Sequence, residues 1–433
     1  MHGGNVIVAI AQEASGSAPA LGDRSWSLRA LFTVGFLGVT AGVQMSDRGL
    51  QAVLLSAIQS SFDVSDAMIG ALQGLAGVLV ASAIAVPIAR LSDRISRKIV
   101  LVGLIVGWSL LMVLSALAPD FPLFFIGRAA SGVTEFAMIP IVYSMIPDLA
   151  PERHRVAANL SFAALMAAGA SAGFYFGDAI VGAADGVFPQ AIEPWRKAFL
   201  LLSLAGVPLI VGALVTLDPP RGVVSDDQPL SASLLVFLRE RWRAVGLFVG
   251  VAGSLMIAVQ ALNPLIAMAL ERRFDAPIAV IGHALGIVTL MTTIGCLPVA
   301  GFLDRLLQRR FGLAARPIIM GVSACAAIPC SLALLSVGDV DRALIAVGAF
   351  LFLTCVANAL VPTMLQDLTP ANLRARSFAV WSFVVAIFCA IGPLAAGALS
   401  DWLLDGQLLA AIAMVAVPAL AVSMLCAVRS ARG

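Results

Sequence analysis

The sequence predicts an all-α polytopic membrane protein with twelve transmembrane helices, arranged as an N-terminal and a C-terminal six-helix bundle. The first indication is composition, because 60% of the 433 residues are hydrophobic and only 12% are charged. The second is that apolar stretches of about 20 residues, long enough to cross a bilayer, recur along the whole chain. The third is that two short motifs occur twice. Soluble globular domains contain about 25% charged residues, so this composition excludes that class.

The predicted spans follow one another with short connections. They cover residues 29–58, 67–89, 99–118, 122–146, 156–182, 196–217, 244–270, 277–303, 315–337, 342–365, 375–400 and 407–428. Residues 1–28 have no basic region before their short apolar run, so we interpret them as a tail and not as a signal peptide. The expected organisation is a cytoplasmic tail over 1–28, an N-terminal bundle over 29–217, a cytoplasmic linker over 218–243, a C-terminal bundle over 244–428 and a cytoplasmic tail over 429–433.

The distribution of basic residues predicts the orientation in the membrane. Twenty of the 27 Lys and Arg residues fall in segments on the side of the N-terminus, five on the opposite side and two within spans. By the positive-inside rule, both termini are expected in the cytoplasm. The excess of Arg over Lys is typical of a GC-rich bacterial genome, so a bacterial inner membrane is expected. The net charge of +2 indicates no nucleic-acid partner. The six cysteines lie in apolar segments without metal-ligand spacing, so no metal ion or disulfide is expected.

Two repeated motifs indicate that the chain is a duplication. Asp93 follows the second predicted helix of the first half, and Asp304 follows the second helix of the second half, 211 residues later. An Asp-Leu-x-Pro motif begins at Asp148 and again at Asp367, 219 residues later, each time after the fourth helix of a half. Internal repeats of this kind place a substrate between the two halves, near the bilayer midplane.

The loop after the second predicted helix carries the signature of a family. It reads Asp93-Arg-Ile-Ser-Arg97-Lys and, together with the six plus six helices, it resembles the loop motif of the major facilitator superfamily over essentially the whole chain. The match is imperfect, because Ala89 and Ser96 stand where that pattern usually has glycines. The Trp-Arg-Lys-Ala-Phe segment at 195–199 is also similar to one common in that superfamily.

Three further features resemble the Spinster-like branch of this superfamily. They are Asp47-Arg48 in the first predicted helix, Arg128 within Gly-Arg-Ala-x-x-Gly in the fourth, and Glu135 shortly after it. The resemblance implies a monomeric transporter that moves lysophospholipids or sphingosine-phosphate-like lipids.

The charged residues inside predicted spans are the candidates for binding and coupling. A charge in hydrocarbon costs about 2.5–3.5 kcal/mol on insertion scales, so such residues are retained for a reason. We expect the planar guanidinium of Arg48 to bind an anionic headgroup, with Arg128 as a second substrate-binding residue. A desolvated Glu135 is the expected proton-coupling residue, and Asp47 is expected to steady or compete for Arg48 and to share in coupling. The alternative is a static salt-bridge cluster that only locks the first helix to the fourth.

A second group of residues is expected to act in gating. In the superfamily, the loop after the second helix is a cytoplasmic latch, which implies conformational roles for Asp93, Arg94 and Arg97, and for Asp304 in the second half. The alternative for the basic residues is that they only set topology.

Two backbone features add to this picture. Asn263-Pro264 interrupts the seventh predicted helix, as a hinge or as an ordinary proline kink. Gly169, Gly173 and Gly177 lie four residues apart and predict a close-packed stripe on the fifth helix.

The chain is not expected to be an enzyme. It has no phosphate-binding loop, no metal-spaced cluster and no long soluble segment, so no cofactor is expected. The charged spans lie in one half and face an apolar second half, which suits an amphipathic substrate. The leading hypothesis is a proton-coupled secondary transporter of an anionic amphipathic small molecule, working by alternating access in the lipid bilayer. Alternatives are a multidrug exporter, an organic-anion transporter or a membrane sensor that does not transport.

Overall fold

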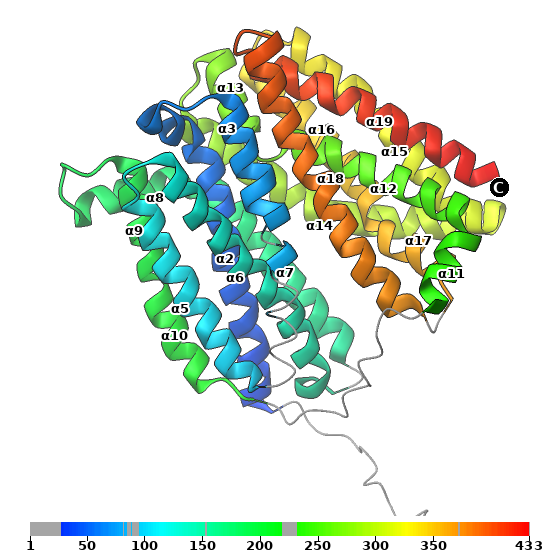
Figure 1. Ribbon diagram of the computed structural model, residues 1–433, viewed down its shortest axis with the longest axis horizontal. Coiled ribbons are helices and arrows are strands. Elements are labelled where there is room, and N and C mark those ends of the chain that lie inside the picture. Colours follow the sequence, from blue (N-terminus) through cyan, green and yellow to red (C-terminus); the bar gives the residue numbers. More distant parts are fainter. Residues whose placement is uncertain are drawn as a thin grey trace, which may run out of the picture.

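The computed structural model describes residues 27–80, 82–84, 88, 95–151, 154–218, 232–370 and 373–432. In these residues the regular structure is helical, and Figure 1 shows two groups of helices that lean against each other. The first group comprises α2 (Leu28–Phe62), α3 (Asp66–Ala71), η1 (Leu72–Val80), α5 (Arg97–Ala116), α6 (Phe121–Leu149), α7 (Arg155–Tyr175), α8 (Gly177–Val187), α9 (Pro194–Leu204) and α10 (Gly206–Val215). The second comprises α11 (Ala232–Glu240), α12 (Trp242–Leu262), α13 (Ile266–Phe274), α14 (Ile278–Phe311), η3 (Gly312–Ala314), α15 (Ala315–Ser336), α16 (Val340–Ala359), α17 (Val361–Leu368), α18 (Arg374–Leu403) and α19 (Leu408–Arg432).

The membrane-spanning segments agree with the prediction of twelve spans. Eleven candidate spans are found among the described residues, and one of them, Ile278–Ser336, contains two helices separated by the short η3 turn. Several predicted spans are interrupted helices: the fifth divides into α7 and α8 at Phe176, and the sixth into α9 and α10 at Ala205. The first helix is longer than predicted, since α2 extends four residues past position 58 to Phe62.

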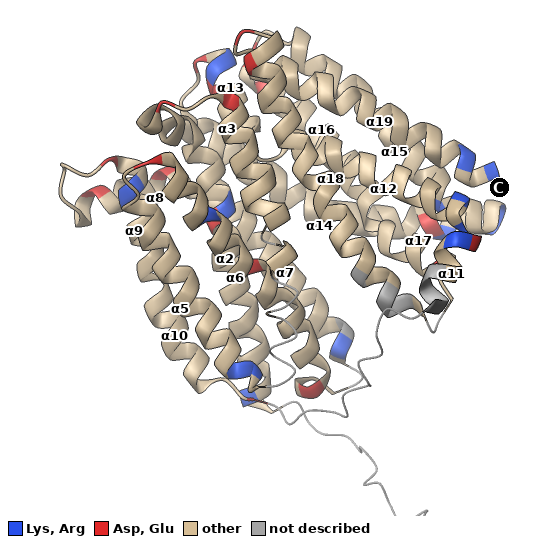
Figure 2. Cartoon of the chain, viewed as in Figure 1, with Lys and Arg blue, Asp and Glu red and all other residues tan. Residues whose placement is uncertain are grey.

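The two ends of the bundles are called the near face and the far face here. The near face is the end at which α2 and α18 begin, and the far face is the end at which they finish (Figure 1). Charged residues gather at these two ends, while a smaller group lies part-way along α2 and α6 (Figure 2). Long apolar segments with charges at their ends are what a bilayer core requires.

At the near face, each bundle carries an ion pair at equivalent positions of the repeat. Arg97 Nη1 lies 2.6 Å from Asp148 Oδ2 in the first bundle, and Arg316 pairs with Asp367 in the second. Each residue of the second pair lies 219 residues after its counterpart, the offset of the Asp-Leu-x-Pro motif. These equivalent pairs support the duplication that the sequence indicates.

The glycine stripe of α7 packs directly on the backbone of α2. A Cβ atom added at Gly169 would lie 2.0 Å from the carbonyl oxygen of Gly42, and one added at Gly173 would lie 2.0 Å from that of Ser46. Contacts this short leave no room for a side chain. The predicted close-packed stripe is therefore confirmed at these two positions, and it fixes α7 beside the part of α2 that carries the charged residues.

Gly169→Ala is expected to lower stability, because the added methyl group must push the two backbones apart. Overpacking of this kind typically costs about 1–3 kcal/mol. The midpoint of thermal unfolding in detergent measures the effect, with Gly182→Ala in α8 as the control, since nothing lies within 4 Å of a Cβ at that position. Equal midpoints for the two variants would contradict the close contact.

Candidate functional site

The charged residues of the first and fourth spans meet between α2 and α6. Asp47 and Arg48 are neighbours on α2, so their side chains leave the helix about 100° apart. Arg128 and Glu135 are seven residues apart on α6 and therefore share a face, about 10 Å apart along its axis. Arg128 Nη1 lies 2.9 Å from Asp47 Oδ2, and Arg48 Nε lies 2.7 Å from Glu135 Oε2. Two ion pairs at different depths therefore tie α2 to α6.

This pairing corrects one expectation from the sequence. Asp47 was expected to steady or compete for Arg48, but its carboxylate contacts Arg128. The physical reason is the helical geometry, which directs adjacent side chains to different neighbours. The two pairs also differ in exposure: Asp47 and Arg128 are 0% and 5% exposed, whereas the side chain of Arg48 is 34% exposed and that of Glu135 only 1%.

Arg128 is enclosed by partners from the same bundle. Its Nε and Nη2 atoms donate to Gln51 Oε1 at 3.1 and 2.7 Å, and the Phe199 ring lies 5.3 Å from its guanidinium carbon. With 5% of its side chain exposed, Arg128 offers no surface to a substrate in this conformation. The geometry therefore favours the static interpretation for Arg128. Sequence reasoning missed Gln51, although its place four residues after Asp47 puts both on one face of α2.

Arg48 has a different environment, since part of its guanidinium remains accessible. Besides Glu135, its Nη2 atom lies 3.4 Å from the carbonyl oxygen of Gly77 in η1, and its guanidinium carbon lies 4.6 Å from the centre of the Phe136 ring. The element η1 is a π-helix, a type that is rare and is frequent at functional sites. Arg48 is thus the member of the cluster best placed to meet a ligand.

The two carboxylates keep one oxygen each without a protein partner. Among the described residues, no group donates a hydrogen bond to the buried oxygens Asp47 Oδ1 and Glu135 Oε1, and neither the amide oxygen nor the amide nitrogen of Gln44, one turn before Asp47, has a hydrogen-bond partner. Buried polar atoms without partners are uncommon, and each calls for an explanation. Among the described residues, no group of three or more His, Cys, Asp or Glu side chains is placed to hold a metal ion.

The residues predicted to act in gating are only partly placed. Asp93 and Arg94 lie outside the described residues. Arg97 contacts Asp148 within the first bundle. Asp304 Oδ2 accepts a hydrogen bond from Arg316 Nη2 at 3.4 Å within the second bundle. Among the described residues, neither Arg97 nor Asp304 makes an ion pair across the interface.

The interruption predicted at Asn263-Pro264 is present. The helix α12 ends at Leu262 and α13 begins at Ile266, so the two predicted residues lie in the connection between them. Whether this break serves as a hinge stays a prediction.

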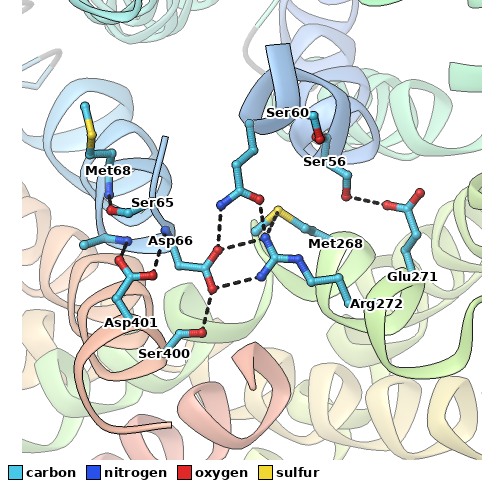
Figure 3. Close-up of polar contacts among 12 residues, drawn as sticks. Ser56, Ser60, Ser65, Asp66, Met68, Met268, Glu271, Arg272, Ser400 and Asp401 are labelled. Carbon is cyan, nitrogen blue, oxygen red and sulfur yellow. Dashed lines mark hydrogen bonds and ion pairs between the residues drawn. The ribbon is translucent and has the colours of Figure 1, made fainter. Parts of the chain in front are cut away.

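A polar cluster at the far face joins the two bundles, and sequence reasoning missed it (Figure 3). Asp66, at the start of α3, accepts hydrogen bonds from Gln59 of α2 and from Arg272 and Ser400 of the second bundle. Asp401 of α18 accepts from the backbone at the start of α3. We call these five residues the far-face cluster. All five residues lie at or near helix ends, where polar residues are expected because the chain passes into a loop. The members from the two bundles are more than 200 positions apart in the sequence, so no motif spacing indicates that they meet.

Residues 36–393 match the family model of the Major Facilitator Superfamily. An MFS-type efflux pump of Mycolicibacterium smegmatis is 24% identical over 88% of this chain and 87% of its own length. A gentisate transporter of Corynebacterium glutamicum is 27% identical over 80% and 76%. The sphingosine-1-phosphate transporter SPNS2 of Xenopus tropicalis is 27% identical over 49% of this chain, which spans only 40% of that relative.

A bacterial homologue of the human lysosomal transporter Spinster, in an inward-facing and unoccupied conformation, superposes with a TM-score of 0.75. The superposition covers 96% of both chains at 20% identity. At this identity the likeness concerns the fold.

Proposed function

The chain belongs to the major facilitator superfamily, and we propose that it is a proton-coupled secondary transporter of an anionic amphipathic small molecule. The membership makes it a multi-pass membrane transporter and not an enzyme. The substrate class is our inference. Within this class, the proposed substrates are lysophospholipids or sphingosine-phosphate-like lipids. We further infer that the protein acts as a monomer, by alternating access, with the near face and both termini in the cytoplasm.

The observation that carries the anionic substrate is the partial exposure of Arg48. Its side chain is 34% exposed while its partner Glu135 is 1% exposed, so one charge of the pair can reach a ligand and the other cannot. A guanidinium binds phosphate or carboxylate through two parallel hydrogen bonds. The ring of Phe136 beside it adds apolar surface. A phosphate or carboxylate attached to an apolar body fits both features.

The same pair supports proton coupling. A ligand anion that binds Arg48 competes with Glu135 for the guanidinium. Glu135 would then be a buried carboxylate without its cation, which is unfavourable unless the carboxylate takes up a proton. Substrate binding and protonation of Glu135 are thereby linked. In the absence of substrate, Arg48 returns to Glu135 and the proton is released.

A binding panel tests the proposed substrate class. Purified protein would be heated with lysophospholipids, sphingoid phosphates and neutral amphiphiles of equal chain length, and the shift in unfolding midpoint would be recorded. We expect stabilisation by the anionic members and little by the neutral ones. Stabilisation that follows chain length alone would exclude the anionic headgroup and favour a multidrug exporter.

One alternative substrate has support of its own. The gentisate transporter of C. glutamicum matches most of this chain, and gentisate is an aromatic organic anion. Arg48 beside Phe136 also suits a compact aromatic carboxylate. Adding gentisate and its uncharged analogue hydroquinone to the binding panel separates the two classes. If gentisate stabilises the protein at concentrations where the lipids have no effect, the proposed substrate would be an aromatic organic acid and not a lipid.

Glu135→Gln is expected to remove the dependence of transport on a pH gradient while retaining binding. Glutamine keeps the size of the side chain but cannot carry an exchangeable charge. Flux into proteoliposomes, measured with and without a pH gradient, provides the readout. Asp178→Asn is the matched control, because Asp178 is an exposed carboxylate on α8, outside the charged cluster. A Glu135→Gln protein that still responds to the gradient as the parent does would place coupling at another residue.

A further inference from the structure

The start of α3 is capped by a carboxylate from the opposite bundle. The backbone N–H of Asp66 donates to Asp401 Oδ1 at 3.0 Å, and that of Ala67 donates to Asp401 Oδ2 at 2.7 Å. The first N–H groups of a helix have no partner within the helix and carry partial positive charge, so a carboxylate there is stabilising. Asp401 lies at the end of α18, in the second bundle. Two N–H groups at the start of α3 therefore have their partner in the opposite bundle, while that of Met68 is capped by Ser65.

The side chain of Asp66 makes a second connection across the same interface. It is 3% exposed, and both of its oxygens are engaged. Arg272 Nη1 and Nη2 donate to Asp66 Oδ2 and Oδ1 at 2.9 and 2.8 Å, in the two-pronged geometry that makes such pairs strong. Ser400 donates to Oδ2 at 2.6 Å, and Gln59 Nε2 donates to Oδ1 at 2.8 Å. Figure 3 shows Arg272 and Ser400 approaching the carboxylate from the second bundle.

Below this cluster, α3 and η1 pack on α18 without intervening side chains. A Cβ at Gly70 would lie 2.3 Å from the carbonyl oxygen of Pro393, and one at Gly74 would lie 2.3 Å from that of Ala390. A Cβ at Gly397 would lie 2.1 Å from the carbonyl oxygen of Asp66. The far-face cluster is thus the polar end of a continuous seam between the bundles. Separating the bundles at the far face requires breaking both the polar contacts of the far-face cluster and the close packing of α3 and η1 on α18.

We propose that the far-face cluster is a latch that holds the far face closed and must release before the Arg48 site can open to that side. This rests on the proposed alternating-access transport. The latch and the site share α2, because Arg48 and Gln59 are eleven residues apart on one unbroken helix, about 16 Å along its axis. A change in the position of α2 at the site therefore reaches Gln59 and its hydrogen bond to Asp66. Asp401 serves in the latch as a removable cap and Arg272 as the cross-bundle cation.

Hydrogen–deuterium exchange of the full-length protein in nanodiscs tests the latch without requiring a substrate. In Arg272→Met, the segment 63–72 should exchange about tenfold faster, since loss of a charge-assisted hydrogen bond shifts an opening equilibrium by at least that factor. If the far face opens by alternating access, the near face must close. The near-face segments 95–104 and 315–324 should then exchange more slowly in the same variant. Arg273→Met, at the exposed neighbouring position, is the control and should match the parent.

A second variant keeps the test independent of one substitution. Asp401→Asn removes the capping charge with little change in shape, and it should produce the same opposite changes at the two faces. Faster exchange of 63–72 alone, with unchanged near-face segments, would mean local loosening and would overturn the latch. So would parent-like exchange in both variants, or an equal effect from Arg273→Met. Because the readout contains no substrate, failure of the anionic-substrate proposal in the binding panel would leave this result unaffected.

Discussion

Replacing Arg48 with alanine is expected to weaken binding of an anionic amphiphile by at least about tenfold. Hydrogen bonds to charged groups contribute about 1.5–3 kcal/mol, and 1.4 kcal/mol is a factor of ten in affinity. Arg48 supplies the accessible cation of the α2–α6 cluster, since the other arginine there is 5% exposed. Titration of the purified protein with an anionic amphiphile and with a neutral one of the same chain length measures the change. Binding of the neutral compound should be unaffected.

Two companion variants separate the role of the charge from that of the fold. Arg48→Ala leaves Glu135 buried without its cation, which by itself lowers stability. The double variant Arg48→Gln/Glu135→Gln removes both charges, so it should be stable and should still fail to distinguish the anion from the neutral compound. Arg48→Lys should recover only part of the affinity, because an ammonium lacks the planar two-pronged geometry. Full anion selectivity in the double variant would contradict the assignment of Arg48.

The largest effect on stability is expected from Arg128→Leu. Asp47 is fully buried and Arg128 is its ion-pair partner at 2.9 Å, so the substitution leaves a carboxylate uncompensated inside the first bundle. Removing one partner of a buried ion pair typically costs about 3–5 kcal/mol. It also removes the cation that binds Gln51. Unfolding by titration with a denaturing detergent in mixed micelles would report the loss.

The double variant Asp47→Leu/Arg128→Leu provides the matched control. Replacing both members of a buried pair with apolar residues is often close to neutral, so most of the lost stability should return. If the double variant is as unstable as the sum of both single variants, the pair does not act as a unit. A transport defect in Arg128→Leu that persists in a stable double variant would return Arg128 to the substrate-binding role that the sequence suggested.

Much of the fold followed from the sequence, because a bilayer limits the choice of structures. Apolar stretches of span length must form helices, and the repeated motifs at Asp148 and Asp367 indicated two related halves. The structure adds the equivalent ion pairs that those aspartates form. The breaks at Phe176 and Ala205 were not predicted, since the apolar composition continues through both positions and hydropathy records composition and not backbone direction.

The charged cluster between α2 and α6 was predictable in its residues and less so in its pairings. An intramembrane charge is conspicuous in sequence, which identified Asp47, Arg48, Arg128 and Glu135. The choice between two arginines for Asp47 depends on the rotation of α2 relative to α6, which no single sequence records. The far-face cluster was missed for a different reason. Asp66 and Arg272 lie at helix ends beside water, where charged residues are ordinary, and only the contact between bundles gives them a partner.

Flux of a matched pair of substrates into proteoliposomes tests the central claim most directly. Vesicles containing the parent protein or the Arg48→Gln/Glu135→Gln variant would be given a lysophospholipid with a phosphate headgroup and the uncharged glycerol analogue with the same acyl chain, with and without a pH gradient. We predict that the parent moves the phosphate compound faster than the neutral one and responds to the gradient, and that the variant does neither. Equal flux of both compounds through the parent, indifferent to the gradient, would contradict a proton-coupled transporter of anionic amphiphiles.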